Sequence, residues 1–113
     1  MDSVSKINRA KYTLLILVSV ALYCCTPKLI PPIEQDVERG KLVWDECNFA
    51  LLQKAHQMYI NKCGSCHALK LPPSQSEESW RKIIPPMAKK AKLNSEEQDL
   101  ILHYVLTMRN AKK

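Results

Sequence analysis

An apolar run near the N-terminus limits how much of this chain can fold. Residues 12–23 are mostly apolar, three basic residues precede them, and Cys24 and Cys25 follow directly. The run is too short to cross a hydrocarbon core of ~30 Å comfortably. A basic segment before a short apolar run is typical of a secretory signal. If residues 1–25 are such a leader, about 88 residues remain, which is enough for one small domain.

The end of the apolar run, Leu22-Tyr23-Cys24-Cys25, resembles the cleavage site of bacterial lipoproteins, in which the cysteine after the cut is lipidated. Cys25 fits this role better than Cys24, because the small Cys24 would then precede the cut instead of the bulky Tyr23. An uncleaved signal anchor is the alternative. Both interpretations predict an exported chain that faces the periplasm and is held at a membrane. The clustered prolines of residues 26–35 predict a semi-rigid tether.

Residues 36–113 predict an all-α domain. Beyond residue 34 the chain has only two glycines, no run of alternating β-branched residues and no hairpin signal. Apolar residues recur instead at helical spacing, as at Leu100, Ile101, Tyr104 and Val105. With 46% apolar and 25% charged residues, the composition excludes a disordered chain.

Three to four helices are expected. The first covers residues 36–44, and the second begins after an N-cap at Asn48 and runs to about residue 62. Ser74 with Glu77 predicts a capping box for a third helix, which Pro85 should end. A second such box at residues 94 and 97 predicts a last helix to about residue 109. Loops are therefore expected at 63–75 and 85–94.

The segment Cys63-Gly64-Ser65-Cys66-His67 carries the strongest chemical signal in the chain. Two thiols three positions apart can form thioethers with the two vinyl groups on one edge of a porphyrin. The histidine that follows can then bind the iron through its imidazole. The small residues between the cysteines let the backbone turn tightly against the ring. The spacing therefore predicts one covalent haem c, held by Cys63, Cys66 and His67.

Three other uses of paired cysteines fit the sequence less well. A thioredoxin-like pair lies between a strand and a helix, and no strand is predicted near the motif. A zinc site needs further ligands at close spacing, whereas Cys47, His56 and His103 are singly placed. A structural disulfide within the motif would leave its histidine without a role.

Residues from about 50 to 108 resemble a small class I-type bacterial cytochrome c domain. The matching segments are residues 55–59, 63–67, 78–80, 86–93 and 101–104. The resemblance implies a helical bundle that holds one covalent haem. Such domains commonly have glycine where the first and last helices cross. Ala55 takes that place here, which predicts a slightly wider crossing.

A methionine sulfur is the usual sixth iron ligand in low-spin cytochromes c, and it raises the reduction potential. Met58 and Met108 lie on the apolar stripes of their helices, so both are predicted core residues. Met87 follows two prolines in the predicted loop, where a segment can fold over the haem, and is the candidate ligand. A core methionine in a linker is the alternative. His103 and His56 are the next candidates, but both are predicted to be surface residues.

Trp80 is predicted either to donate its indole N–H to a haem propionate, as the resemblance implies, or to pack in the core with another polar partner. A carbonyl near Leu71 or Pro72 is expected to accept the Nδ1 proton of His67, which would fix the orientation of the ring.

Two further expectations concern the core. Tyr59 and Tyr104 are expected to be partners where the first and last haem-domain helices cross. Cys47 is interpreted as a small buried hydrophobe, with a thiol that pairs between chains as the alternative.

The sequence predicts an electron carrier rather than an enzyme, because it is poor in acid, base and nucleophile constellations. A haem enzyme or sensor, peroxidase-like or gas-binding, with an open or displaceable sixth ligand is the alternative. Lys89, Lys90 and Lys92 flank Met87 and are expected either to steer an acidic redox partner or to form an ordinary solvated helix face. No surface for nucleic acid is predicted.

Overall fold

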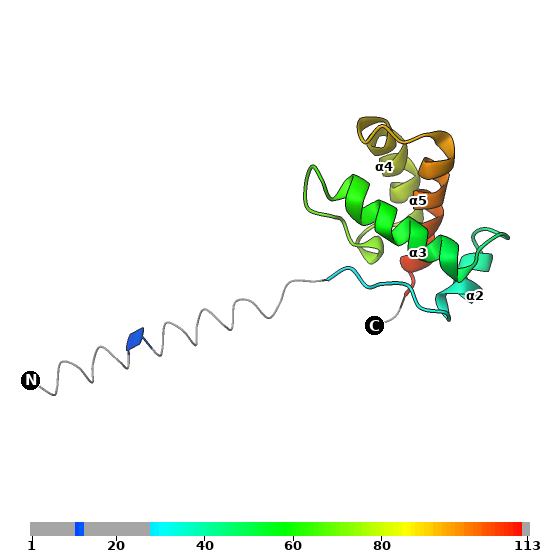
Figure 1. The fold of residues 1–113 in the computed structure, drawn as a ribbon, viewed down its shortest axis with the longest axis horizontal. Coiled ribbons are helices and arrows are strands. Elements are labelled where there is room, and N and C mark those ends of the chain that lie inside the picture. Colours follow the sequence, from blue (N-terminus) through cyan, green and yellow to red (C-terminus); the bar gives the residue numbers. More distant parts are fainter. Residues whose placement is uncertain (1–10, 13–27, 112–113) are drawn as a thin grey trace, which may run out of the picture.

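The computed structural model describes residues 11–12 and 28–111, and this part of the chain is an all-α domain without strands (Figure 1). The predicted leader therefore lies outside the described residues, except for Lys11 and Tyr12, and so does the candidate lipidation site Cys25. Four α-helices and two short turns make up the domain: α2 (Asp36–Lys41), α3 (Phe49–Met58), the π-helical turn η1 (Tyr59–Cys63), the 3₁₀ turn η2 (Pro72–Ser74), α4 (Glu77–Lys90) and α5 (Ser95–Met108).

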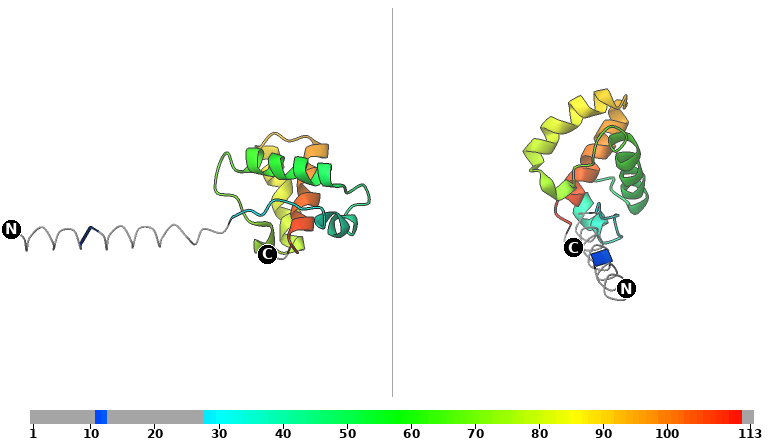
Figure 2. Two further views of the ribbon diagram at one scale, coloured as in Figure 1. Left: turned by 60° about the horizontal axis from the view of Figure 1, so that its bottom comes forward. Right: turned by 90° about the vertical axis from the view of Figure 1, so that its left-hand side faces the viewer.

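The C-terminal helix α5 is the centre of the domain. Helices α2, α3 and α4 all pack on it, whereas α3 and α4 contact each other only slightly (Figure 2). From residue 104 to residue 108 every side chain of α5 is buried. A helix whose side chains are buried on most sides has neighbours on several of its faces. Helix α5 is therefore the central element on which α2, α3 and α4 pack.

Both predicted asparagine caps are confirmed. The Asn48 side chain accepts a hydrogen bond from the Leu51 backbone N–H at 3.0 Å, at the start of α3. At the start of α5 the Asn94 side chain accepts from the Glu97 N–H at 2.9 Å, and the Glu97 carboxylate accepts from the Asn94 N–H at 3.0 Å. This is the complete capping box, and it satisfies backbone donors that the first turn of a helix leaves free.

Both predicted ends of the third helix were wrong. The N-cap is Ser76, whose Oγ accepts from the Ser79 N–H at 3.1 Å, because Ser74 already belongs to the turn η2. The helix then continues through Pro85 and Pro86 to Lys90, so no loop begins at residue 85. The two prolines remove the helical donors of the carbonyls at residues 81 and 82. Both of those residues are exposed, so water can replace the missing donors.

Helix α2 ends at residue 41, three residues earlier than predicted, because the chain turns back on itself there. The Trp44 backbone N–H donates to the Gly40 carbonyl at 2.9 Å. A Cβ on Gly40 would lie 2.1 Å from Cys47 Sγ, so only glycine allows this approach. Cys47 is 4% exposed, and its interpretation as a buried hydrophobe is confirmed.

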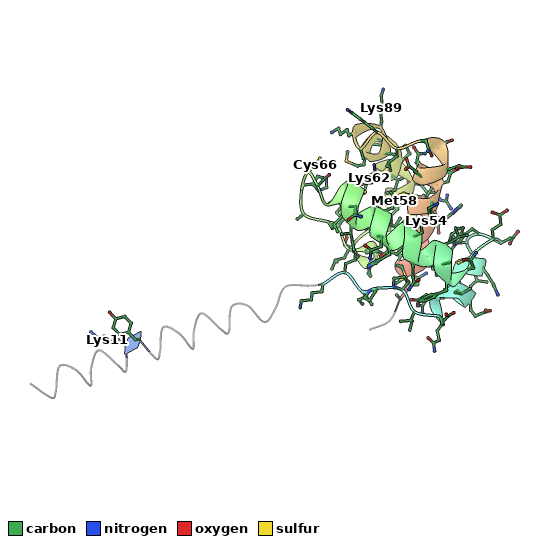
Figure 3. The ribbon with its side chains drawn as sticks, viewed as in Figure 1. Lys11, Lys54, Met58, Lys62, Cys66 and Lys89 are labelled. Carbon is green, nitrogen blue, oxygen red and sulfur yellow. The ribbon has the colours of Figure 1, made fainter. Side chains whose placement is uncertain are left out.

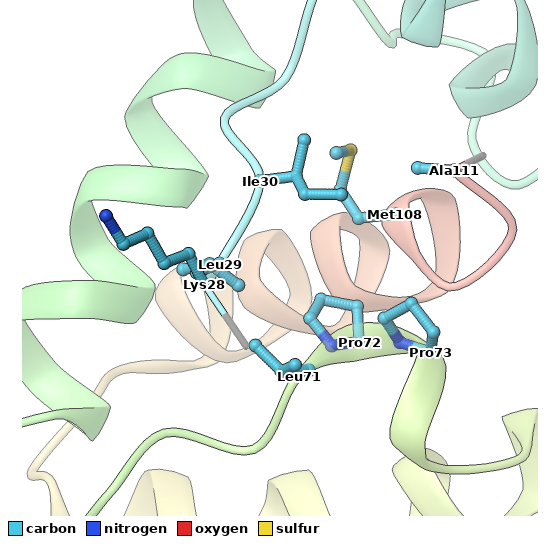
Figure 4. A pocket seen from close by; sticks show the side chains of 8 residues that line it. All are labelled: Lys28, Leu29, Ile30, Leu71, Pro72, Pro73, Met108 and Ala111. Carbon is cyan, nitrogen blue, oxygen red and sulfur yellow. The ribbon is translucent and has the colours of Figure 1, made fainter. Parts of the chain in front are cut away.

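The described part of the predicted tether runs along the domain. Leu29 packs against the core and Pro32 is buried. An apolar cavity of about 220 Å³ lies between the tether, η2 and the end of α5 (Figure 4), and it is lined by Lys28, Leu29, Ile30, Leu71, Pro72, Pro73, Met108 and Ala111. Within residues 11–12 and 28–111, no helix is both long and apolar enough to cross a membrane.

Candidate functional site

The motif of residues 63–67 begins at the last residue of η1, the turn that continues α3. This turn is a π-helix, and the Gly64 N–H donates to the Ile60 carbonyl at 3.0 Å. A Cβ on Gly64 would lie 2.5 Å from that carbonyl oxygen, so the close approach requires glycine. Single π-helical turns are rare and often occur at functional sites. The wide turn therefore sets where the first cysteine of the motif leaves the helix.

The two thiols of the motif are unbonded to each other. Cys63 is half-buried, and burial raises the pKa of its thiol, while Cys66 is exposed. Figure 3 labels Lys54, Met58 and Lys62 along α3 and η1, which lead to the turn that carries Cys66. Free thiols on one short loop are the state in which thioethers can form at both positions.

His67 is exposed, and its Nδ1 lies 2.9 Å from the Ala68 carbonyl oxygen. A carbonyl can only accept a hydrogen bond, so Nδ1 carries the proton of the neutral ring. The lone pair is therefore on Nε2, which is the tautomer that a metal ligand needs. The expected role of a backbone carbonyl is thus filled by Ala68, rather than by Leu71 or Pro72.

The loop that follows the motif is held by two buried aromatic donors. The Tyr59 hydroxyl donates to the Lys70 carbonyl at 2.6 Å, and the Trp80 indole N–H donates to the Pro72 carbonyl at 2.9 Å. Trp80 thus has a polar partner within the core, as one of its two interpretations requires. Its donation to a haem propionate stays a prediction, and the indole would have to release Pro72 to make it.

The three methionines of the described domain have different surroundings. Met108 is 2% exposed and Met58 packs against the core, which confirms both as core residues. Met87 lies in the last turns of α4 rather than in a loop, because α4 extends past its two prolines. It is half-buried and does not pack against the buried core. Of these three methionines, Met87 is thus the one whose side chain makes no contact with the core. Its role as an iron ligand stays a prediction.

The two remaining histidines are not surface residues, and this prediction was wrong. His56 is 8% exposed, and its Nδ1 lies 2.7 Å from the Tyr104 hydroxyl. His103 is half-buried and stacks on Trp44 with ring centroids 5.0 Å apart and an angle of 18° between the planes. The short helix α2 packs on α5, and Trp44, in the turn after α2, lies over His103.

Sequence reasoning missed the pair of His56 and Tyr104. The residues of α3 and η1 that are buried are Leu52, Ala55, His56 and Tyr59, which is the spacing i, i+3, i+4, i+7 of one helix face. That spacing was the available signal. The expected contact of Tyr59 with Tyr104 is confirmed, with ring centroids 5.7 Å apart.

The residues of the motif fit a covalent haem by the chemistry of their donors: two free thiols, then an imidazole whose Nδ1 faces a backbone carbonyl, which leaves Nε2 for a metal. In residues 11–12 and 28–111, no group of three or more His, Cys, Asp and Glu side chains is placed to hold a bare metal ion. Comparison with protein-family models, curated proteins and solved structures found no match to this chain.

Proposed function

We propose that this chain is a membrane-anchored, periplasm-facing c-type cytochrome with one haem, which passes single electrons between redox partners. The observation that carries the proposal is the contact of the His67 ring with the backbone. Nδ1 of the ring faces the Ala68 carbonyl at 2.9 Å, directly after two unbonded thiols, so Nε2 is available to iron.

Each residue of the motif has a distinct task in this function. Cys63 and Cys66 attach the porphyrin, and His67 binds the iron from one side. When bound, the haem supplies an iron that changes between the ferrous and ferric states. The carbonyl of Ala68 keeps the imidazole oriented, and this bond makes the ring a more basic ligand. The buried bonds from Tyr59 and Trp80 hold the loop behind it.

Met87 is the proposed sixth ligand. Its side chain is half-buried without packing on the core, so a bond from sulfur to iron costs no core contact. A thioether favours the ferrous state and raises the reduction potential. A sulfur bound in this way also closes the iron to other molecules, which favours an electron carrier. The alternative of a haem enzyme or sensor requires an open or displaceable sixth position.

The lysines at the end of α4 support an acidic redox partner. Lys89, Lys90 and Lys92 are all exposed, close in sequence to Met87 (Figure 3, which labels Lys89). Exposed positive charges near a site of electron transfer speed up the encounter with a negatively charged partner. This rate should fall as the salt concentration rises, because exposed charges are screened beyond a Debye length of about 10 Å at 0.1 M salt.

A substitution of Met87 tests the electron-carrier function. In Met87→Ala the haem should stay covalently attached, the reduction potential should fall, and carbon monoxide should bind, unlike in the parent protein. Met58→Leu and Met108→Leu are matched controls that should keep the parent spectrum, because leucine has a similar volume. Spectra in both redox states and voltammetry measure these outcomes. Carbon monoxide binding by the parent protein would favour the enzyme or sensor instead.

A further inference from the structure

A buried aromatic cluster, which the proposed function uses only to hold a loop, crosses the core. Trp80 meets Tyr59 edge to face with ring centroids 6.4 Å apart, and Tyr59 meets Tyr104 at 5.7 Å. His56 meets Tyr104 at 5.6 Å. All four side chains are at most 8% exposed. The cluster therefore forms a continuous series of aromatic contacts from α4 through η1 and α5 to α3.

The members of this cluster differ in the group that accepts their hydrogen bond. Trp80 donates to the carbonyl of Pro72, and Tyr59 donates to the carbonyl of Lys70. A backbone carbonyl cannot take up a proton at neutral pH. Tyr104 alone has a base as its partner, because its hydroxyl lies 2.7 Å from Nδ1 of His56. This distance is within the reach required of a general base.

His56 is in the right state to act as that base. Burial lowers the pKa of its imidazole, so the ring is neutral near pH 7. With the proton of the neutral ring on Nε2, the Tyr104 hydroxyl donates to Nδ1, which can accept the phenolic proton. The ring also lines an open cavity of about 490 Å³ between α3 and the tether, which is large enough for several water molecules. A proton taken up by the ring can therefore be shared with solvent.

We propose that Tyr104 is a redox-active tyrosine and that His56 is the base that accepts its phenolic proton. The electron goes to a strong one-electron oxidant outside the cluster, of the class of a high-potential metal complex. As the electron leaves, the O–H bond of Tyr104 breaks and an N–H bond forms at Nδ1 of His56. The products are a neutral phenoxyl radical and an imidazolium. One electron from a reductant and the return of the same proton restore both residues.

Buried surroundings explain why the base decides which residue is oxidised. A phenol that loses an electron becomes a very strong acid, and a positive charge confined to a fully buried ring is costly unless the proton moves to a base that borders solvent. His56 is such a base, because it lines the open cavity beside α3. Tyr59 and Trp80 donate only to backbone carbonyls, which cannot take up a proton. The radical should therefore form on Tyr104. Tyr104 would then be oxidised in place of residues in the loop that carries the motif. This property does not depend on the haem.

Electron paramagnetic resonance of the full chain tests the inference. The background carries Tyr12→Phe and Tyr23→Phe, which leaves only the two tyrosines of the cluster. A photogenerated ruthenium(III) polypyridyl complex is the oxidant, and samples are frozen after the flash. We expect a tyrosyl signal that Tyr104→Phe removes and that Tyr59→Phe leaves unchanged. A signal that disappears with Tyr59→Phe and survives Tyr104→Phe would overturn the proposal.

His56→Gln tests the role of the base. The glutamine amide can still accept a hydrogen bond from Tyr104, but it cannot take up the proton. The rate of radical formation should fall by about 100-fold, the lower end of what a positioned base contributes. Circular dichroism should show that the variant retains its helices. An unchanged rate would exclude His56 as the base.

A third measurement leaves both residues of the pair intact. In the Tyr59→Phe form of the same background, Tyr104 is the only tyrosine. Ring-deuterated tyrosine should then narrow the radical signal. A signal of unchanged width would place the radical on another residue type and refute the proposal, whether or not the other variants fold.

Discussion

Replacing Tyr59 by phenylalanine removes one hydroxyl and leaves the aromatic contacts of the ring in place. The hydroxyl donates to the Lys70 carbonyl at 2.6 Å, and the side chain is 3% exposed. A neutral hydrogen bond of this kind contributes about 0.5–1.5 kcal/mol. Lys70 is exposed, so water can reach its carbonyl and replace the lost donor. We therefore expect the free energy of unfolding to fall by about 1 kcal/mol.

Thermal unfolding should show this loss as a Tm about 4–8 °C lower, the shift expected for a domain of this size. The loss should also be local, because the bond holds the loop just after the motif. Trypsin cleavage after Lys70 should become about fivefold faster, since cleavage follows the population of the opened loop. Leu42→Ala is the control, because Leu42 lies in the domain and is 88% exposed, and it should change neither quantity.

The opposite results would refute this account of the loop. An unchanged Tm together with an unchanged cleavage rate would mean that Tyr59 does not hold Lys70. A fall in Tm without faster cleavage would mean that the hydroxyl stabilises the core but not the loop. Covalent haem attachment should persist in Tyr59→Phe, because neither thiol is altered.

Two further predictions concern pH and membrane attachment. Burial lowers the pKa of His56 from its usual value of 6.5, so the unfolded chain binds more protons than the folded one as the pH falls below 6.5. The free energy of unfolding should decrease over that range, and His56→Gln should make urea titrations less dependent on pH; an equal dependence would contradict this. Cys25→Ser should release or mislocalise the protein in fractionated cells. A variant that stays in the membrane with its apolar run uncleaved would indicate a signal anchor instead.

The helix starts that depend on local chemistry could be predicted from the sequence. Asn48 and Asn94 each cap a helix with their own side chain, and the box of Asn94 with Glu97 needs no distant partner. The prediction of Ser74 as the N-cap of the third helix was wrong, because a second serine two residues later can also cap a helix. Ser76 is the serine that lies outside η2. Local rules rank the residue types but do not choose between neighbours.

The features that depend on tertiary contacts could not be predicted in this way. Pro85 should end a helix by local rules, but α4 continues through it on a face where water replaces the lost donors. The burial of His103 depends on Trp44, which the turn after α2 places against it. Nothing in the spacing of either residue indicates this contact.

The residues of the candidate site could be proposed from the sequence, but the contacts around them could not. The spacing of the motif specifies two cysteines and a histidine, and these lie together on one short loop. The carbonyl that holds His67 proved to be that of the next residue, Ala68. Trp80 turned out to bind Pro72, because η2 brings that carbonyl beside α4. Which carbonyl meets which donor is decided by how the loop folds.

Covalent haem attachment is the claim on which the account depends, and intact mass measures it most directly. The full chain should be produced in a host that matures c-type cytochromes, and then extracted with acidic acetone. We expect the extracted protein to keep the mass of one haem, and the variant Cys63→Ser/Cys66→Ser to lack it. A parent protein whose mass equals that of the polypeptide alone, with the haem in the acetone or no haem at all, would contradict the account.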